Sequence, residues 1–158
     1  MSSARSHFLD LFFYPKSVAV VGASRNARSN NFHLVSNLVK LKFTGKVYPV
    51  NSNAEEIMGL KVYPDLKSIE GDVDLAVISV PATMTLDIVK DCVVKRVKGI
   101  TIIAGGFSEI GSEGKKAQDE ILNLLRKNRI RAIGPNALSP INSVNNFIVG
   151  FDPKKEDY

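Results

Sequence analysis

Four short stretches of small and polar residues recur along this 158-residue chain, each directly after an apolar run. They cover residues 22–31, 51–53, 81–83 and 104–109. Small residues let a ligand approach the main chain closely. The hydroxyl, amide and guanidinium groups in the first two stretches, together with free N–H groups where a helix begins, are donors suited to phosphate. The pattern indicates binding of a phosphorylated ligand. No nucleophile with a neighbouring base stands out, so we predict no catalytic residues.

The first stretch reads "VGASRNARSNN" and occupies the place of a dinucleotide-binding fingerprint. A nicotinamide-binding domain usually has G-x-G-x-x-G here, whereas this chain has Gly22, Ser24 and Ala27 at the three glycine positions. Its candidate ligand-binding residues are Gly22, Ala23, Ser24, Arg25, Asn26 and Ala27. The alternative is that Ser24 and Asn26 only cap a helix and that the arginines are solvated.

The second stretch ends an apolar run with neutral polar residues. Its candidates are Val50, Asn51, Ser52 and Asn53. A nicotinamide site commonly has an acidic residue at this place, bonded to the ribose hydroxyls. Glu55 and Glu56 come later than that position. The neutral ending therefore argues against a nicotinamide cofactor.

The third and fourth stretches contain small residues that leave room beside the main chain. Their candidates are Val80, Pro81, Ala82, Ala104, Gly105 and Gly106. The alternative for the glycine pair is a tight turn into the next helix, with Ser112 and Glu113 as its cap. The residues by themselves leave both interpretations open.

The elements that must position these stretches alternate in type. Short β-branched runs predict strands at 17–22, 45–51, 73–81, 99–106 and 130–136. Apolar residues at helical spacing predict helices over 31–43, 84–96 and 113–128, with a short edge element within 55–69. Strands that are apolar on both faces and alternate with helices are typical of a covered parallel sheet.

We therefore predict an α/β fold, a Rossmann-like doubly wound parallel sheet in three layers. Ligands of such sheets bind at the carboxyl ends of the strands, where all four stretches would meet. We assign residues 1–151 to this one domain and residues 152–158 to a polar tail or the start of a linker.

Composition excludes several classes of protein. Cys92 is the only cysteine, which excludes an internal disulfide and a cysteine-based zinc site, and we predict no metal. No apolar run approaches the roughly 20 residues that span a bilayer, and the amino terminus does not resemble a secretory signal. We therefore expect a cytoplasmic protein without a membrane partner.

The net charge of +5 suits a polyanionic partner. Two basic segments, 94–99 and 126–131, raise the alternative of a nucleic-acid-binding module. No aromatic residues are interleaved with them to stack on bases, and basic residues at a helix carboxyl end also stabilise the helix dipole. We expect no nucleic-acid partner.

Six segments together carry a family resemblance. They are "FYPKSVAVVGAS" (13–24), "GKVYPVN" (45–51), "GLKVYPDL" (59–66), "VDLAVISVPA" (73–82), "AGGFSEIG" (104–111) and "IGPNALSPIN" (133–142). In this order and spacing the chain resembles the CoA-binding domain of the succinyl-CoA synthetase superfamily, and is most similar to ADP-forming acetyl-CoA and acyl-CoA synthetases. The resemblance implies coenzyme A, or acyl-CoA, as the ligand.

The resemblance also implies a role for each stretch. Residues 24–27 would lie against the pantetheine and phosphates, and 50–53 near the adenosine and its phosphates. Residues 80–82 would wall the groove, 104–106 would approach the thiol end, and the turn 134–136 would form the floor. The chain departs from the family at two places. Ser52 and Asn53 stand where a lysine is usual, and Ala137 stands where a cysteine is common.

Family catalysis passes phosphate through a histidine of a following domain and through an ATP-grasp unit. His7 and His33 match neither motif. The resemblance therefore implies the CoA-binding domain of an NDP-forming acyl-CoA synthetase, a thioester-forming ligase with NTP turnover. Alone it would bind without turning over, with the phosphohistidine and ATP-grasp units as partners. The alternative is a nicotinamide dinucleotide-binding regulatory or oxidoreductase fragment.

Overall fold

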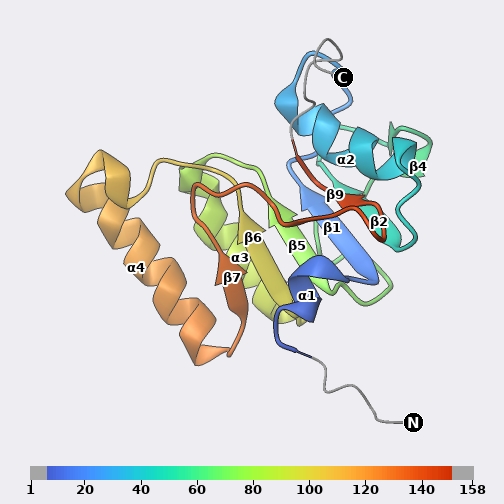
Figure 1. Cartoon of the computed structure of the whole chain (residues 1–158). Coiled ribbons are helices and arrows are strands. Elements are labelled where there is room, and N and C mark those ends of the chain that lie inside the picture. The colour runs from blue at the N-terminus through green and yellow to red at the C-terminus, as the bar shows by residue number, and fades with distance from the viewer. Residues whose placement is uncertain (1–6, 151–158) are drawn as a thin grey trace, which may run out of the picture.

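A computed structural model describes residues 7–150, which are built around one five-stranded sheet (Figure 1). Its strands are β1 (Ser17–Val21), β2 (Lys46–Val50), β5 (Leu75–Ile78), β6 (Gly99–Ile102) and β7 (Arg131–Ile133). The spatial order is β2-β1-β5-β6-β7, and every neighbouring pair is parallel. From β1 the chain moves first to one side and later to the other, so the switch in strand order lies between β1 and β5.

Helices cover both faces of the sheet, which confirms the predicted three-layer, doubly wound fold. One face carries α3 (Ala82–Lys95) and α4 (Ser112–Lys127), and the other carries α1 (Asp10–Phe13) and α2 (Asn30–Lys40). Alternate residues of one strand serve the two layers. In β1, Ala19 and Val21 pack toward α3 and α4, while Val18 and Val20 pack toward α2.

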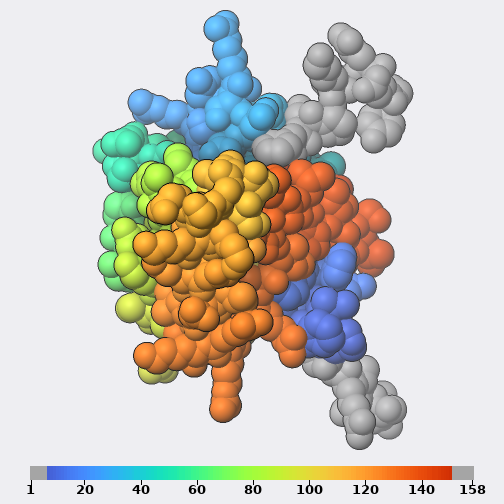
Figure 2. Space-filling view, turned by 90° about the vertical axis from the view of Figure 1, so that its left-hand side faces the viewer, coloured from blue at the N-terminus to red at the C-terminus, as the bar shows by residue number. Residues whose placement is uncertain are grey.

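Short pieces of structure complete the chain. They are β3 (Glu56–Ile57), β4 (Leu60–Lys61), the 3₁₀ turn η1 (Ser108–Ile110), β8 (Ile141–Asn142) and β9 (Phe147–Ile148). The segment from β7 to β9 crosses the sheet toward α2 (Figure 1). It buries Phe147 and Val149 completely in the α2 layer. Figure 2 shows this red segment beside α4 and α1.

Helix boundaries agree with the predicted ones within a few residues, but one predicted cap is wrong. Ser112 is the first residue of α4, and Gly111 occupies the N-cap position without any side-chain cap. Gly111 has a φ of 112°, a backbone conformation that glycine adopts without strain. The predicted tail, 152–158, lies outside the described residues. No helix within 7–150 is long and apolar enough to cross a membrane.

Candidate functional site

The carboxyl ends of β1 and β5 lie against each other at the switch in strand order. Gly22 follows β1 with a φ of 87°, and a Cβ placed on it would stand 2.3 Å from the carbonyl oxygen of Ser79. Asn31 of α2 joins both strand ends, because its Nδ2 donates to the carbonyl oxygens of Gly22 and Ser79, each at 2.8 Å. Asn31 is not among the predicted site residues, although an asparagine in a first helical turn beside a strand tip is a signal for such a bridge.

The stretch after β2 is joined to the same strand tips. Asn51 Nδ2 donates to the Ala23 carbonyl at 2.7 Å, and Asn51 Oδ1 accepts the N–H of Asn53 at 2.7 Å. The main chain of Asn51 also donates to Tyr63, at 3.0 Å. The side chain of Asn51 therefore shapes the second stretch and fastens it to the first.

A surface pocket of about 340 Å³ opens between these tips and α3. Six of the predicted site residues line it: Gly22, Val50, Asn51, Ser52, Asn53 and Val80. Seven lining residues were not predicted: Val21, Pro64, Asp65, Leu66, Met84, Ile88 and Asp91. A larger hollow of about 450 Å³ lies beside β2 and β4, away from the strand tips where such folds bind ligands.

The unpredicted lining residues come from two places. Residues 64–66 belong to the connection after β4, whose path across the strand ends no local pattern specifies. Met84, Ile88 and Asp91 lie on one face of α3, at spacings of four and three. That spacing was a usable signal, because the predicted helix over 84–96 begins beside a strand tip.

The remainder of the first stretch does not line the pocket. Ser24 Oγ accepts the N–H of Asn26, and Asn26 Oδ1 accepts the N–H of Arg28, so these side chains shape a turn. The helix begins only at Asn30, with Ser29 as its cap. The alternative in which Ser24 and Asn26 cap a helix is therefore wrong. In this turn Ser24 is half-buried, whereas Arg25, Asn26 and Ala27 are exposed.

The third and fourth stretches meet each other instead of the pocket. Pro81 is the N-cap of α3, and Ala82 is its first residue. Gly106 has a φ of 98°, and a Cβ on it would lie 3.2 Å from the Cβ of Ala82. Of these two stretches, only Val80 reaches the lining of the pocket.

A carboxylate of this chain covers the glycine pair of the fourth stretch. Glu109 Oε1 accepts the Gly106 N–H at 2.6 Å and would lie 3.0 Å from a Cβ on Gly105. Main-chain N–H groups of Glu109, Gly106 and Phe107 lower the pKa of this carboxyl. On the other side, the Ala104 carbonyl accepts the N–H of Asn136 at 2.9 Å, which places the turn 134–136 beside this stretch.

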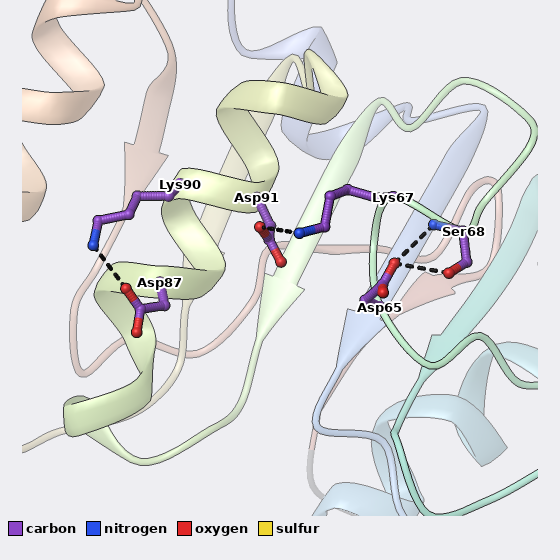
Figure 3. A network of polar contacts seen from close by, with 6 residues as sticks. All are labelled: Asp65, Lys67, Ser68, Asp87, Lys90 and Asp91. Atoms are coloured by element: carbon purple, nitrogen blue, oxygen red, sulfur yellow. Dashed lines mark hydrogen bonds and ion pairs between the residues drawn. The ribbon is translucent and has the colours of Figure 1, made fainter.

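The two carboxylates in the pocket lining have partners, Ser68 for Asp65 and Lys67 for Asp91 (Figure 3). Asp65 Oδ1 accepts both the hydroxyl and the main-chain N–H of Ser68 at 2.8 Å, and these bonds lower the pKa of Asp65. Lys67 Nζ lies 3.0 Å from Asp91 Oδ1, and this carboxylate raises the pKa of Lys67. The Lys67–Asp91 pair joins the connection after β4 to α3 at the rim of the pocket.

Groups suited to catalysis or metal binding do not gather here. Burial raises the pKa of the Cys92 thiol to about 12, and the residue is fully buried. His7 is exposed and caps the turn before α1, with its Nδ1 accepting the Leu9 N–H. Within 7–150, no three histidine, cysteine or acidic residues could hold a metal ion together. The two basic segments meet elsewhere, around a hollow lined by Arg96, Lys98 and Arg129.

A parallel α/β sheet with a pocket at its switch point defines the class of nucleotide-binding domains of doubly wound topology. Comparison with known proteins identifies the family. Residues 16–141 match the family model described as a CoA-binding domain. The chain belongs to this family of CoA-binding domains, and coenzyme A is its ligand.

Relatives with known names agree. The chain is 44% identical to an ADP-forming acetate–CoA ligase of Archaeoglobus fulgidus over 88% of the chain and 21% of the ligase. It is 41% identical to the alpha subunit of such a ligase from Pyrococcus furiosus, over 90% of the chain and 31% of the subunit. It therefore spans about a fifth to a third of these relatives.

A solved structure confirms the fold and the family. It is the acetyl-coenzyme A synthetase 1 of Ca. Korarchaeum cryptofilum, in complex with phosphate and ADP. The TM-score is 0.87 at 35% identity, covering 93% of this chain and 31% of that one. The chain is thus homologous to the CoA-binding region of ADP-forming acyl-CoA ligases, and the nicotinamide alternative is not favoured.

Proposed function

We propose that the chain holds coenzyme A along the carboxyl ends of β1, β2, β5 and β6 and presents it to the other units of an ADP-forming acyl-CoA ligase. The observation that carries this is the pocket at the switch point, which is lined by Gly22, by residues 50–53 and by Val80, in a chain of the CoA-binding family. The fourth stretch adjoins the third through Gly106 and Ala82.

The pocket residues fit the adenosine end of CoA. Leu66, Val80 and Ile88 supply apolar walls for a purine, as is usual in small-molecule sites. Ser52 adds a hydroxyl and Asn53 an amide group for its polar edge or the ribose. We therefore assign the second stretch, residues 50–53, to the adenosine end of the ligand.

The other predicted stretches are assigned to the rest of the cofactor. The turn 24–27 offers hydroxyl and amide groups to the phosphates, and Arg25 and Arg28 are exposed cations nearby in sequence. Pro81 and Ala82, next to Val80 at the pocket wall, would flank the pantetheine arm. Residues 104–106 would receive its thiol end at the main chain of the glycine pair, once the exposed Glu109 carboxylate turns away from the Gly106 N–H.

Turnover would need further units. By analogy with the much longer relatives, we propose a phosphohistidine unit and an ATP-grasp unit as partners, acting together in the cytoplasm. This chain would bind and orient CoA, while the other units would form the acyl phosphate, whose carbonyl the thiol attacks to give the thioester and release inorganic phosphate. When this chain is joined to the other units, its role is to position the thiol of CoA for that attack.

Titration calorimetry with CoA and with NADH tests the proposal. We expect CoA to bind and NADH not to bind. Val80→Phe fills the pocket and should weaken CoA binding by about tenfold or more, because a filled site excludes the purine. Val94→Phe is the matched control, since Val94 is 68% exposed on α3 and does not line the pocket. No heat at millimolar CoA, or tighter binding of NADH, would overturn the proposal.

A further inference from the structure

The charge arrangement around the pocket carries an inference about which form of the cofactor it accepts. The two charged residues in its lining are the carboxylates of Asp65 and Asp91. The lining contains no lysine or arginine. A phosphate on the ribose of a bound adenosine would therefore meet like charges, with no cation in the pocket wall to oppose them.

The cations closest along the chain are already engaged. Lys67 pairs with Asp91 at 3.0 Å, and Lys90 pairs with Asp87 at 2.7 Å. Figure 3 draws both pairs. A lysine held by a carboxylate gives up that attraction if it turns to a phosphate. Neither ammonium is therefore free to receive a ribose phosphate without breaking an ion pair.

The loop after β2 adds hydrogen bonds but no charge. Ser52 and Asn53 are exposed and neutral. The amide of Asn51 is occupied on both sides, by the Ala23 carbonyl and by the Asn53 N–H. The arginines of the first stretch, Arg25 and Arg28, do not line the pocket.

We propose that this pocket binds the adenosine of the cofactor without recognising its 3′-phosphate, so that the chain makes little distinction between CoA and 3′-dephospho-CoA. The inference rests on the proposed CoA site and deepens it. Its logic is that of nicotinamide enzymes, in which an acidic residue accepts bonds from free ribose hydroxyls and an arginine accommodates a ribose phosphate. Here the carboxylate of Asp65 or Asp91 would accept hydrogen bonds from the ribose hydroxyls.

Calorimetry with CoA and 3′-dephospho-CoA gives the first test. For the unmodified chain we expect the dissociation constants of the two ligands to agree within about threefold, because the pocket makes no charge-assisted hydrogen bond to the 3′-phosphate. A preference of tenfold or more for CoA would overturn the inference while leaving CoA binding intact. Binding of neither ligand would instead remove the proposed function, and the inference with it.

Releasing Lys67 gives the second test. Asp91→Asn removes one carboxylate from the pocket and frees the ammonium, so the preference should move toward CoA by about threefold to tenfold. Lys67→Met alone leaves the Asp91 carboxylate unpaired and should move the preference slightly toward 3′-dephospho-CoA, and in the Asp91→Asn background it should cancel part of the shift. An unchanged ratio in Asp91→Asn would contradict the inference.

A matched control lies on the same helix. Asp87→Asn breaks the Lys90–Asp87 pair, which has the same charges but lies outside the pocket lining. It should leave the ratio of the two dissociation constants unchanged. Thermal unfolding of each variant confirms that a changed ratio does not reflect a damaged fold. An equal shift in Asp87→Asn would mean that overall charge, and not the pocket, sets the preference.

Discussion

Asn31 and Ser79 exchange two hydrogen bonds: Asn31 Nδ2 donates to the Ser79 carbonyl, and Ser79 Oγ donates to Asn31 Oδ1, both at 2.8 Å. Asn31 also holds Gly22. One side chain of α2 therefore joins the two strand tips between which the ligand pocket begins.

Asn31→Ala should lower the free energy of unfolding by about 2 kcal/mol, because it leaves two carbonyl groups and a hydroxyl without their partner. It should also weaken CoA binding, since the strand tips lose their common anchor. Urea unfolding and calorimetry measure the two effects. Asn30→Ala is the control, because Asn30 is exposed in the same helical turn. Equal stability of the two variants would contradict the bridging role.

Gly22 is expected to tolerate no side chain. Gly22→Ala places a methyl group 2.3 Å from the Ser79 carbonyl and also strains a positive φ. We expect a loss of about 3 kcal/mol or more in the free energy of unfolding. Gly59→Ala separates the two causes, because Gly59 has a φ of 77° but nothing within 4 Å of an added Cβ. It should lose only about 1 kcal/mol, and a similar loss in both variants would discount the close contact.

Asp74 should make stability depend on acid pH. Burial raises its pKa, but hydrogen bonds from Lys98 and from the main chain of Lys16 and Ser17 outweigh burial and hold the pKa below 3.8. A carboxyl with a lowered pKa stabilises the fold above its unfolded pKa, and this contribution disappears as the pH falls through the folded value. Urea unfolding at decreasing pH should show this loss below about pH 4.

Asp74→Asn should lower the free energy of unfolding by about 1–2 kcal/mol at neutral pH. It should also reduce the further loss of stability at acid pH. Asp119→Asn breaks the exposed pair with Lys115 on α4 and should change stability at neutral pH by no more than about 0.5 kcal/mol. If the free energy of unfolding falls as steeply with decreasing pH in Asp74→Asn as in the parent, other groups cause the pH dependence.

Cys92 should be inert in the folded chain. It is fully buried, and its pKa is about 12, so almost no thiolate forms at neutral pH. A thiol reagent at pH 8 should label it only at the rate of unfolding, and completely in urea. Because Cys92 is the only cysteine, the labelling is unambiguous. Rapid labelling of the native protein would mean that α3 opens locally.

Phe147 should be essential for the fold although it follows the last strand of the main sheet. Its ring is fully buried, with its centroid 5.4 Å from that of Phe43. Phe147→Ala should lower the free energy of unfolding by about 3–5 kcal/mol. Val144→Ala, at a residue 83% exposed in the same segment, should have almost no effect. Similar behaviour of both variants would mean that this segment is not part of the folded domain.

The fold was readable from the sequence because its signals are local. Runs such as 18–21 and 75–78 are apolar at every residue, and only a sheet covered on both faces buries such strands. The alternation with helices then specifies parallel pairing. Asn51 and Val80 could be assigned to the site for the same reason, since parallel strands carry their carboxyl ends to a common edge.

Only the tertiary structure decided which segments that are distant in the sequence meet at the pocket and in the α2 layer. Pro64 and Leu66 enter the pocket through an irregular connection, and Phe147 reaches the α2 layer by crossing the sheet. Neither path leaves a periodic pattern, because each depends on packing between residues far apart in the chain. The pairing of Lys67 with Asp91, which decides the charge at the pocket rim, is likewise a contact between elements and appears only when α3 lies beside the connection.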